Sequence, residues 1–206
     1  MRGLWNLFPR ARYICTMGPR PASFKSAVAA FLAVLCLASP LAAQQTEEER
    51  EADLLRQLSG AEDPQAAFMI EGELRTLWSR SGSAAIDLLL RRGKDALEGG
   101  RPDEAAEHFT AAIDWDPQFA EAYVGRAQAY YLTNDVGPAI DDLRQALVLN
   151  PNNWEALMGF AAVLEEVGLE EDALEVWRQV HDMHPQNPEA SAAVDRLEQQ
   201  LQGLTL

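Results

Sequence analysis

Two of the three histidines, His181 and His184, lie three residues apart, with Asp182 between them. Histidines at this spacing share one face of a helix, and imidazole nitrogens and carboxylates are ligands that Zn²⁺ accepts. A closed zinc site needs four ligands, and the sequence nearby supplies no others. Positive side chains are also favoured near the C-terminal end of a helix. We therefore interpret the pair as part of a helix end and keep a histidine metal site as a minor alternative.

The residue types that catalyse reactions occur without the partners they need. The serines of segment 79–83 have no Gly-x-Ser-x-Gly turn and no histidine nearby. The acidic pairs at 141–142 and 165–166 are adjacent in sequence, so their members point to different helix faces and indicate solvated surface. No glycine-rich phosphate loop is present. The sequence predicts neither an enzyme nor a bound cofactor.

Any functional residue must be positioned by elements of the sequence that recur with a period of 34 residues. Pro117, Pro151 and Pro185 lie at the same place in three successive units. Matching positions in the three units are Ala105, Ala139 and Ala173; Phe109, Leu143 and Trp177; Ala112, Ala146 and Val180; and Gly93, Ala127 and Ala161. Small residues where two helices cross, a bulky residue between them and a closing proline are typical of stacked helix-turn-helix units.

Each unit is predicted to contain two helices. Gly100, Asn134 and Gly168 occupy equivalent positions, and these residue types readily adopt the left-handed conformation that closes a helix. Pro102 and Pro138 favour the start of the following helix. The expected first helices are near 86–98, 120–133 and 154–167, and the expected second helices are near 103–115, 137–149 and 171–183.

This pattern resembles the tetratricopeptide repeat family, over roughly residues 86–202. The resemblance implies an all-α fold, a right-handed α-α superhelix of three helix-turn-helix repeats with a preceding helix and a C-terminal capping helix. The expected repeats, within 83–187, are 86–119, 120–153 and 154–187, and the capping helix lies in 188–206. The apolar face of that last helix contains Ala190, Ala193, Val194, Leu197 and Leu201. Such a helix closes the apolar end of a stack.

A further helix is expected before the repeats, within segment 63–82. It begins at Asp63 and Pro64 and carries apolar residues at helical spacing. We expect this helix to cover the apolar face that the first repeat would otherwise expose. The acid-rich segment 44–62 is interpreted as a frayed helix or a flexible tether.

The resemblance implies a concave groove lined by the first helices, in which a peptide or helix of a partner protein binds. The groove positions carried over from the family are Asp87, Leu90, Arg91, Lys94, Glu121, Val124, Gln128, Tyr131, Glu155, Met158, Ala162 and Glu165. Because these side chains are mostly apolar or acidic, we expect an apolar or basic partner segment. Tyr131, Val124 and Met158 would anchor that segment, and Glu121 and Glu155 would orient it.

Some members of the family clasp a C-terminal carboxylate with Lys, Asn and Arg side chains. The matching positions here are Leu90, Lys94, Gly125, Gln128, Glu155 and Gly159. Only Lys94 fits, and Glu155 would repel a carboxylate, so a clamp of this type is not expected. Gly125 and Gly159 are expected to leave room in the groove for the backbone or a bulky side chain of the ligand.

Residues 1–43 have the composition of a secretory signal. They contain five basic residues and no acidic one, with an apolar run at 27–37 and then small residues around Pro40. This order predicts cleavage before Gln44 and export to the periplasm of a Gram-negative-type bacterium. An anchor in the inner membrane that faces the periplasm is the alternative, although the run is shorter than the about 20 residues that span a bilayer.

Removal of residues 1–43 would leave a strongly acidic chain. Twelve basic and 32 acidic residues would remain, giving a formal charge of −20. Such a surface disfavours nucleic acid and anionic lipid and favours basic partners. We therefore expect a protein-interaction scaffold or adaptor. The alternative is a self-assembling structural spacer, oligomeric and without a dedicated ligand.

Overall fold

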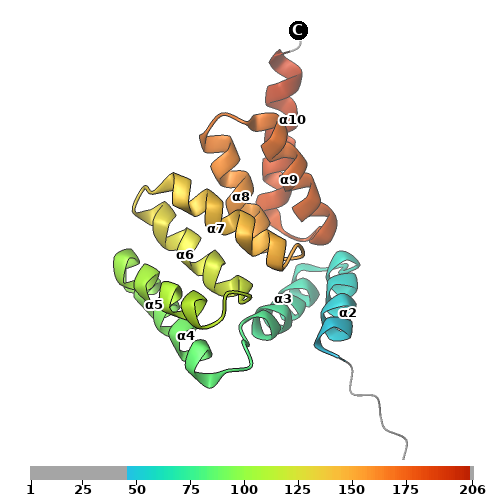
Figure 1. Cartoon of the computed structure of the whole chain (residues 1–206). Coiled ribbons are helices and arrows are strands. Elements are labelled where there is room, and N and C mark those ends of the chain that lie inside the picture. The colour runs from blue at the N-terminus through green and yellow to red at the C-terminus, as the bar shows by residue number, and fades with distance from the viewer. Residues whose placement is uncertain (1–45, 205–206) are drawn as a thin grey trace, which may run out of the picture. The chain divides into compact units, whose positions relative to one another are not determined.

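The computed structural model describes residues 46–204, which form nine helices with no strand in that range (Figure 1). The predicted signal at 1–43 lies outside the described residues. The helices are α2 (Glu47–Ser59), α3 (Pro64–Trp78), α4 (Ala84–Glu98), α5 (Pro102–Trp115), α6 (Ala120–Leu132), α7 (Val136–Leu149), α8 (Trp154–Glu166), α9 (Glu170–Met183) and α10 (Pro188–Leu204). None of these helices is both long and apolar enough to cross a membrane.

Helices α4 to α9 form the three expected pairs, and each begins and ends within two residues of its expected position. Gly100, Asn134 and Gly168 close the first helix of each pair with φ angles of +69°, +66° and +78°. Glycine and asparagine tolerate this left-handed conformation better than other residues, so the turn positions read from the sequence are confirmed.

The first repeat packs around the ring of Phe109, which is fully buried on α5. Gly93 on α4 and Gly125 on α6 both face this ring, and a Cβ atom at either glycine would lie 2.5 Å from it. Gly125 therefore lets α5 and α6 approach closely, and the expectation that it leaves room for a ligand is wrong. Gly159 on α8 lies beside Leu143 instead, where an added Cβ would be 3.3 Å away.

A buried ion pair joins α6 to α7 in the second repeat. Arg126 donates from Nε and Nη2 to the two carboxylate oxygens of Asp142, at 2.7 and 2.8 Å. Asp142 is only 6% exposed, whereas the adjacent Asp141 is exposed. The interpretation of the 141–142 pair as solvated surface is therefore wrong for Asp142. Adjacent residues of a helix point to different faces, and the side chain of Asp142 faces Arg126 on the neighbouring helix.

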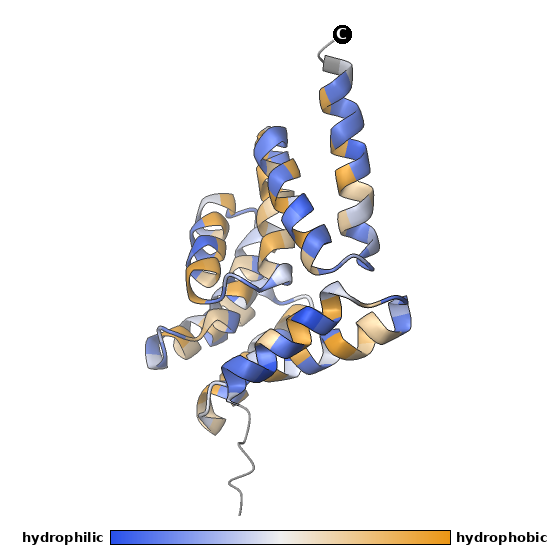
Figure 2. Ribbon diagram, turned by 90° about the vertical axis from the view of Figure 1, so that its right-hand side faces the viewer, coloured by the Kyte–Doolittle hydropathy of each residue, from blue (hydrophilic) through white to orange (hydrophobic). Residues whose placement is uncertain are grey.

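The last helix, α10, packs along α9 and buries Ala190, Ala193 and Leu197. Figure 2 shows that polar residues accompany apolar ones along this helix, which ends at the label C. A helix with one apolar and one polar side shields the end of a stack, as expected of a capping helix.

The N-terminal helices α2 and α3 form a hairpin. Thr46 and Glu49 cap α2 reciprocally, and Leu54 and Leu58 of this helix are buried. Segment 44–62 was interpreted as a frayed helix or a flexible tether. In the structure most of it is the helix α2, whose buried leucines pack it against the rest of the fold. Asp63 caps α3 by accepting from two backbone N–H groups, with Pro64 at the first helical position.

The hairpin packs on the third repeat, so the expectation that α3 covers the first repeat is wrong. Leu74 and Trp78 of α3 belong to the same hydrophobic cluster as Trp154 and Trp177, whereas the core of the first repeat forms a separate cluster. The physical reason is that Trp78, the largest apolar side chain of α3, packs against the ring of Trp154 at the start of α8.

Replacing Gly125 by alanine should lower the free energy of unfolding by about 1–3 kcal/mol, because the added methyl group must displace the buried ring of Phe109. Urea titration measures this change. The control is Gly72→Ala on α3, where the new Cβ meets nothing within 4 Å. There the better helix propensity of alanine should stabilise the protein by about 0.5–1 kcal/mol. Equal effects at the two glycines would contradict the close packing around Phe109.

Candidate functional site

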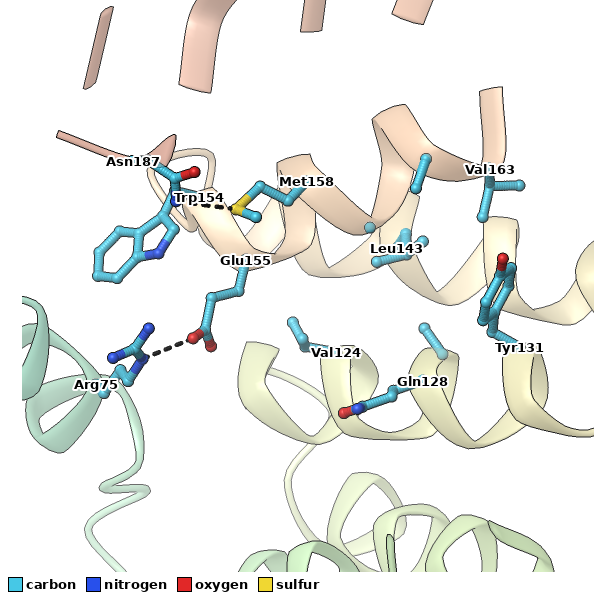
Figure 3. A pocket seen from close by; sticks show the side chains of 13 residues that line it. Arg75, Val124, Gln128, Tyr131, Leu143, Trp154, Glu155, Met158, Val163 and Asn187 are labelled. Atoms are coloured by element: carbon cyan, nitrogen blue, oxygen red, sulfur yellow. Dashed lines mark hydrogen bonds and ion pairs between the residues drawn. The ribbon is translucent and has the colours of Figure 1, made fainter. Parts of the chain in front are cut away.

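A cleft of about 440 Å³ runs between α6 and α8 (Figure 3). Its sides are mostly apolar, and the first helices of the second and third repeats supply most of them. The lining residues are Val124, Ala127, Gln128 and Tyr131 on α6, Leu143 on α7, Trp154, Glu155, Met158, Gly159, Ala162 and Val163 on α8, Arg75 on α3, and Asn187 before α10.

The structure brings half of the predicted groove residues together in this cleft. They are Val124, Gln128, Tyr131, Glu155, Met158 and Ala162. The other six lie outside it; they are Asp87, Leu90, Arg91, Lys94, Glu121 and Glu165. Their role in binding a partner stays a prediction.

The predicted residues on α4 serve mainly the first repeat itself. Leu90 is 2% exposed within the core of that repeat. Asp87 accepts hydrogen bonds from the backbone N–H and the hydroxyl of Ser81, at 2.8 and 2.7 Å, and so holds the turn before α4. Arg91 is exposed on the same helix.

Glu121 is buried between the first helices and does not line the cleft. It accepts a hydrogen bond from Asn153 at 2.8 Å, and Lys94 lies 3.6 Å from its other oxygen. Burial raises the pKa of Glu121, while Lys94 acts in the opposite direction. Only 5% of this residue is exposed, so a ligand in the cleft does not meet its carboxylate.

Glu165 has a structural task on the other side of α8. It accepts hydrogen bonds from the indole of Trp177 at 2.7 Å and from Arg196 of the capping helix at 2.6 Å. The hydrogen bond from Arg196 is the main reason why the pKa of Glu165 is lowered. Glu165 thus joins α8, α9 and α10.

One end of the cleft is formed by residues that the repeat pattern did not identify. Arg75 donates from Nε to Glu155 at 2.6 Å and pairs through Nη1 with Glu71 at 3.0 Å. Its guanidinium also lies 5.8 Å from the centre of the Trp154 ring. Figure 3 shows Arg75, Trp154 and Asn187 grouped at this end, away from Tyr131. Arg75 lies outside the repeats, so no periodic signal in the sequence marks it. Trp154, in contrast, is an aromatic residue at the start of an expected helix, which is a signal that the sequence contains.

The opposite end of the cleft combines exposed apolar side chains with one carboxylate. Tyr131 is 46% exposed there, and the adjacent Leu132 is also exposed. The negative charge of Glu166 and its hydrogen bond to the phenol raise the pKa of Tyr131. Val167, the next residue, is exposed as well. A ligand at this end of the cleft would therefore meet both the phenol of Tyr131 and the carboxylate of Glu166.

The two closely spaced histidines connect helices. His184 is buried, and its Nε2 lies 2.7 Å from Glu71 of α3. Nδ1 of His181 lies 3.2 Å from the hydroxyl of Ser191 on α10. Across residues 46–204, no group of three or more His, Cys, Asp or Glu side chains is arranged to hold a metal ion. The geometry thus favours the interpretation of these histidines as parts of helix packing.

Stacked helical hairpins with a cleft between their first helices are the architecture of a helical-repeat protein with an interaction surface. Comparison with known proteins identifies the family. A family model described as tetratricopeptide repeat matches residues 90–153. A TPR repeat-containing protein of Rhizobium etli is 30% identical over 161 residues, which are 78% of this chain and 79% of that protein. The chain belongs to the tetratricopeptide repeat (TPR) family, as its sequence pattern indicated.

Solved structures agree with this fold. The first TPR of Spaghetti (RPAP3), bound to an HSP90 peptide, superposes with a TM-score of 0.55 at 26% identity and covers 58% of this chain and 94% of that one. The Arabidopsis OM64 TPR domain gives a TM-score of 0.54 at 24% identity, over 56% of this chain and 96% of that domain. The all-α repeat fold is confirmed, and with it the class of protein, a protein–protein interaction scaffold.

Replacing Trp78 by alanine should lower the free energy of unfolding by about 3–5 kcal/mol, because it removes a buried ring 4.7 Å from that of Trp154. The backbone amides of α2 and α3 should also lose protection against hydrogen exchange. Phe68→Ala is the control on the same helix, where 67% of the side chain is exposed and a change within about 0.5 kcal/mol is expected. Similar small effects for both variants would show that the hairpin does not dock on the third repeat.

Proposed function

We propose that this protein is an exported adaptor that holds an apolar or basic segment of a partner protein in the cleft between α6 and α8. The observation that carries the proposal is the cleft itself. It joins apolar side chains such as Val124 and Met158 to the partly exposed Tyr131 and to the carboxylate of Glu155. Aromatic anchors in an apolar groove with few polar groups are typical of sites that bind peptide segments.

The proposed ligand differs from the one named for the structural relative. The HSP90 peptide bound to the first TPR of RPAP3 has the sequence SRMEEVD, which ends in acidic residues. Here Lys94 lies beside Glu121, and Glu155 places a negative charge in the cleft. An acidic tail would therefore meet repulsion, which supports an apolar or basic ligand.

The proposed place of action is the periplasm, after cleavage of the signal at residues 1–43. Support comes from the composition of that segment, whose five basic residues precede an apolar run. The alternative is a chain that keeps this segment as an inner-membrane anchor and faces the periplasm. Either form would present the cleft to proteins of the cell envelope.

A crosslinking pull-down from the envelope fraction, quantified by mass spectrometry, tests the proposed function. The double variant Tyr131→Ala with Met158→Ala should reduce recovery of the partner at least about fivefold, because both anchors leave the cleft. The matched control is Trp115→Ala with Val148→Ala, which removes two side chains that are 76% and 75% exposed outside the cleft.

Partner recovery that is unchanged in the cleft variant would contradict the assignment of the cleft. If recovery instead falls in the control variant, the outer surface of the helices binds the partner. Loss of copies of this chain from the crosslinked material in that control would support the self-assembling spacer.

A further inference from the structure

Helix α8 carries one carboxylate in the cleft, that of Glu155, and a second, that of Glu166, next to Tyr131 at the far end of the cleft. Glu155, Met158, Ala162 and Glu166 follow at spacings of three, four and four residues, which keeps their side chains on one side of the helix. The two glutamates are eleven positions apart, which corresponds to about 16 Å along an α-helix. A carboxylate therefore lies near each end of the cleft, with apolar side chains between the two.

At the Arg75 end, one cation serves two carboxylates. Arg75 contacts Glu155 at 2.6 Å and Glu71 at 3.0 Å. His184 contacts the other oxygen of Glu71, and the buried Nδ1 of that histidine has no partner among the described residues. One guanidinium is thus shared by two carboxylates, and the 35% exposed side chain of Glu155 presents its charge to the cleft.

At the Tyr131 end, the carboxylate is that of Glu166. Glu166 is exposed, and its interaction is with the phenol of Tyr131. Within residues 46–204, no lysine or arginine forms an ion pair with it. A positive group of a ligand can therefore reach Glu166 without displacing a salt bridge.

We propose that the cleft selects a segment with two basic side chains about 16 Å apart and apolar side chains between them, one basic group at Glu155 and the other at Glu166. This inference rests on the proposed function. In an extended segment, which rises about 3.3 Å per residue and points alternate side chains to opposite sides, the two basic residues are about four or six positions apart. In a helical segment they are about eleven positions apart. The apolar residues between them contact Val124, Met158 and Tyr131.

Selection from a phage library of random 16-residue peptides tests this ligand class on the full chain. The library is first depleted on the Tyr131→Ala, Met158→Ala variant, so that retained peptides depend on the cleft. We expect enrichment of Lys or Arg at two positions about four or six residues apart, or about eleven residues apart, with apolar residues between them.

Affinities of the enriched peptides, measured by fluorescence anisotropy, test the two carboxylates. Glu155→Gln and Glu166→Gln should each weaken binding at least about fivefold, because the amide keeps the shape of the side chain and removes its charge. Glu171→Gln, at an exposed position on α9, is the matched control and should leave the affinity unchanged.

The outcomes separate the two proposals. If the wild-type chain retains no peptide that depends on Tyr131 and Met158, the proposed function fails, and the inference fails with it. If such peptides are found without an excess of basic residues, the inference alone is overturned. The same holds if both glutamine variants bind the peptides with the affinity of the wild-type chain.

Discussion

The contact between α3 and the start of α8 is the interaction on which the binding cleft depends. Trp78 packs on Trp154 with ring centres 4.7 Å apart, and Arg75 of the same helix reaches Glu155. This contact joins residues about 80 positions apart in sequence and passes over the first two repeats. It turns an N-terminal hairpin that is not itself a repeat into one end of the cleft, next to the third repeat.

The repeats supply the rigid part of the site. Phe109 fixes α4 and α6 against α5, because the two glycines that face its ring allow close approach. The buried pair between Arg126 and Asp142 then fixes α6 against α7. A buried ion pair of this geometry is costly to break, so α6 presents Val124 and Tyr131 from a defined position. The cleft is therefore bordered on both sides by helices that have their own packing, and a ligand does not need to order them.

The repeat fold could be predicted from the sequence because each unit restates the same local signals. Small residues at crossings and Gly100, Asn134 and Gly168 at turns identified six helices with errors of at most two residues. The position of the hairpin carried no such signal, since Trp78 could in principle pack on any apolar face. For the same reason the sequence placed Glu121 in the groove, whereas the structure buries it beside Asn153. The residues at repeat positions were predictable, and their use for packing or for binding depended on tertiary contacts.

Paramagnetic relaxation enhancement tests the docking of the hairpin most directly. A nitroxide would be attached at Glu62→Cys, in the turn between α2 and α3, in the full chain with Cys15 and Cys36 replaced by serine. The neighbouring Ala61 accepts a hydrogen bond from Gln186 at 3.2 Å, so the account predicts strong broadening of the backbone amide signals of residues 184–190. Broadening of the amides of α4 and α5 instead would place the hairpin on the first repeat and contradict the account.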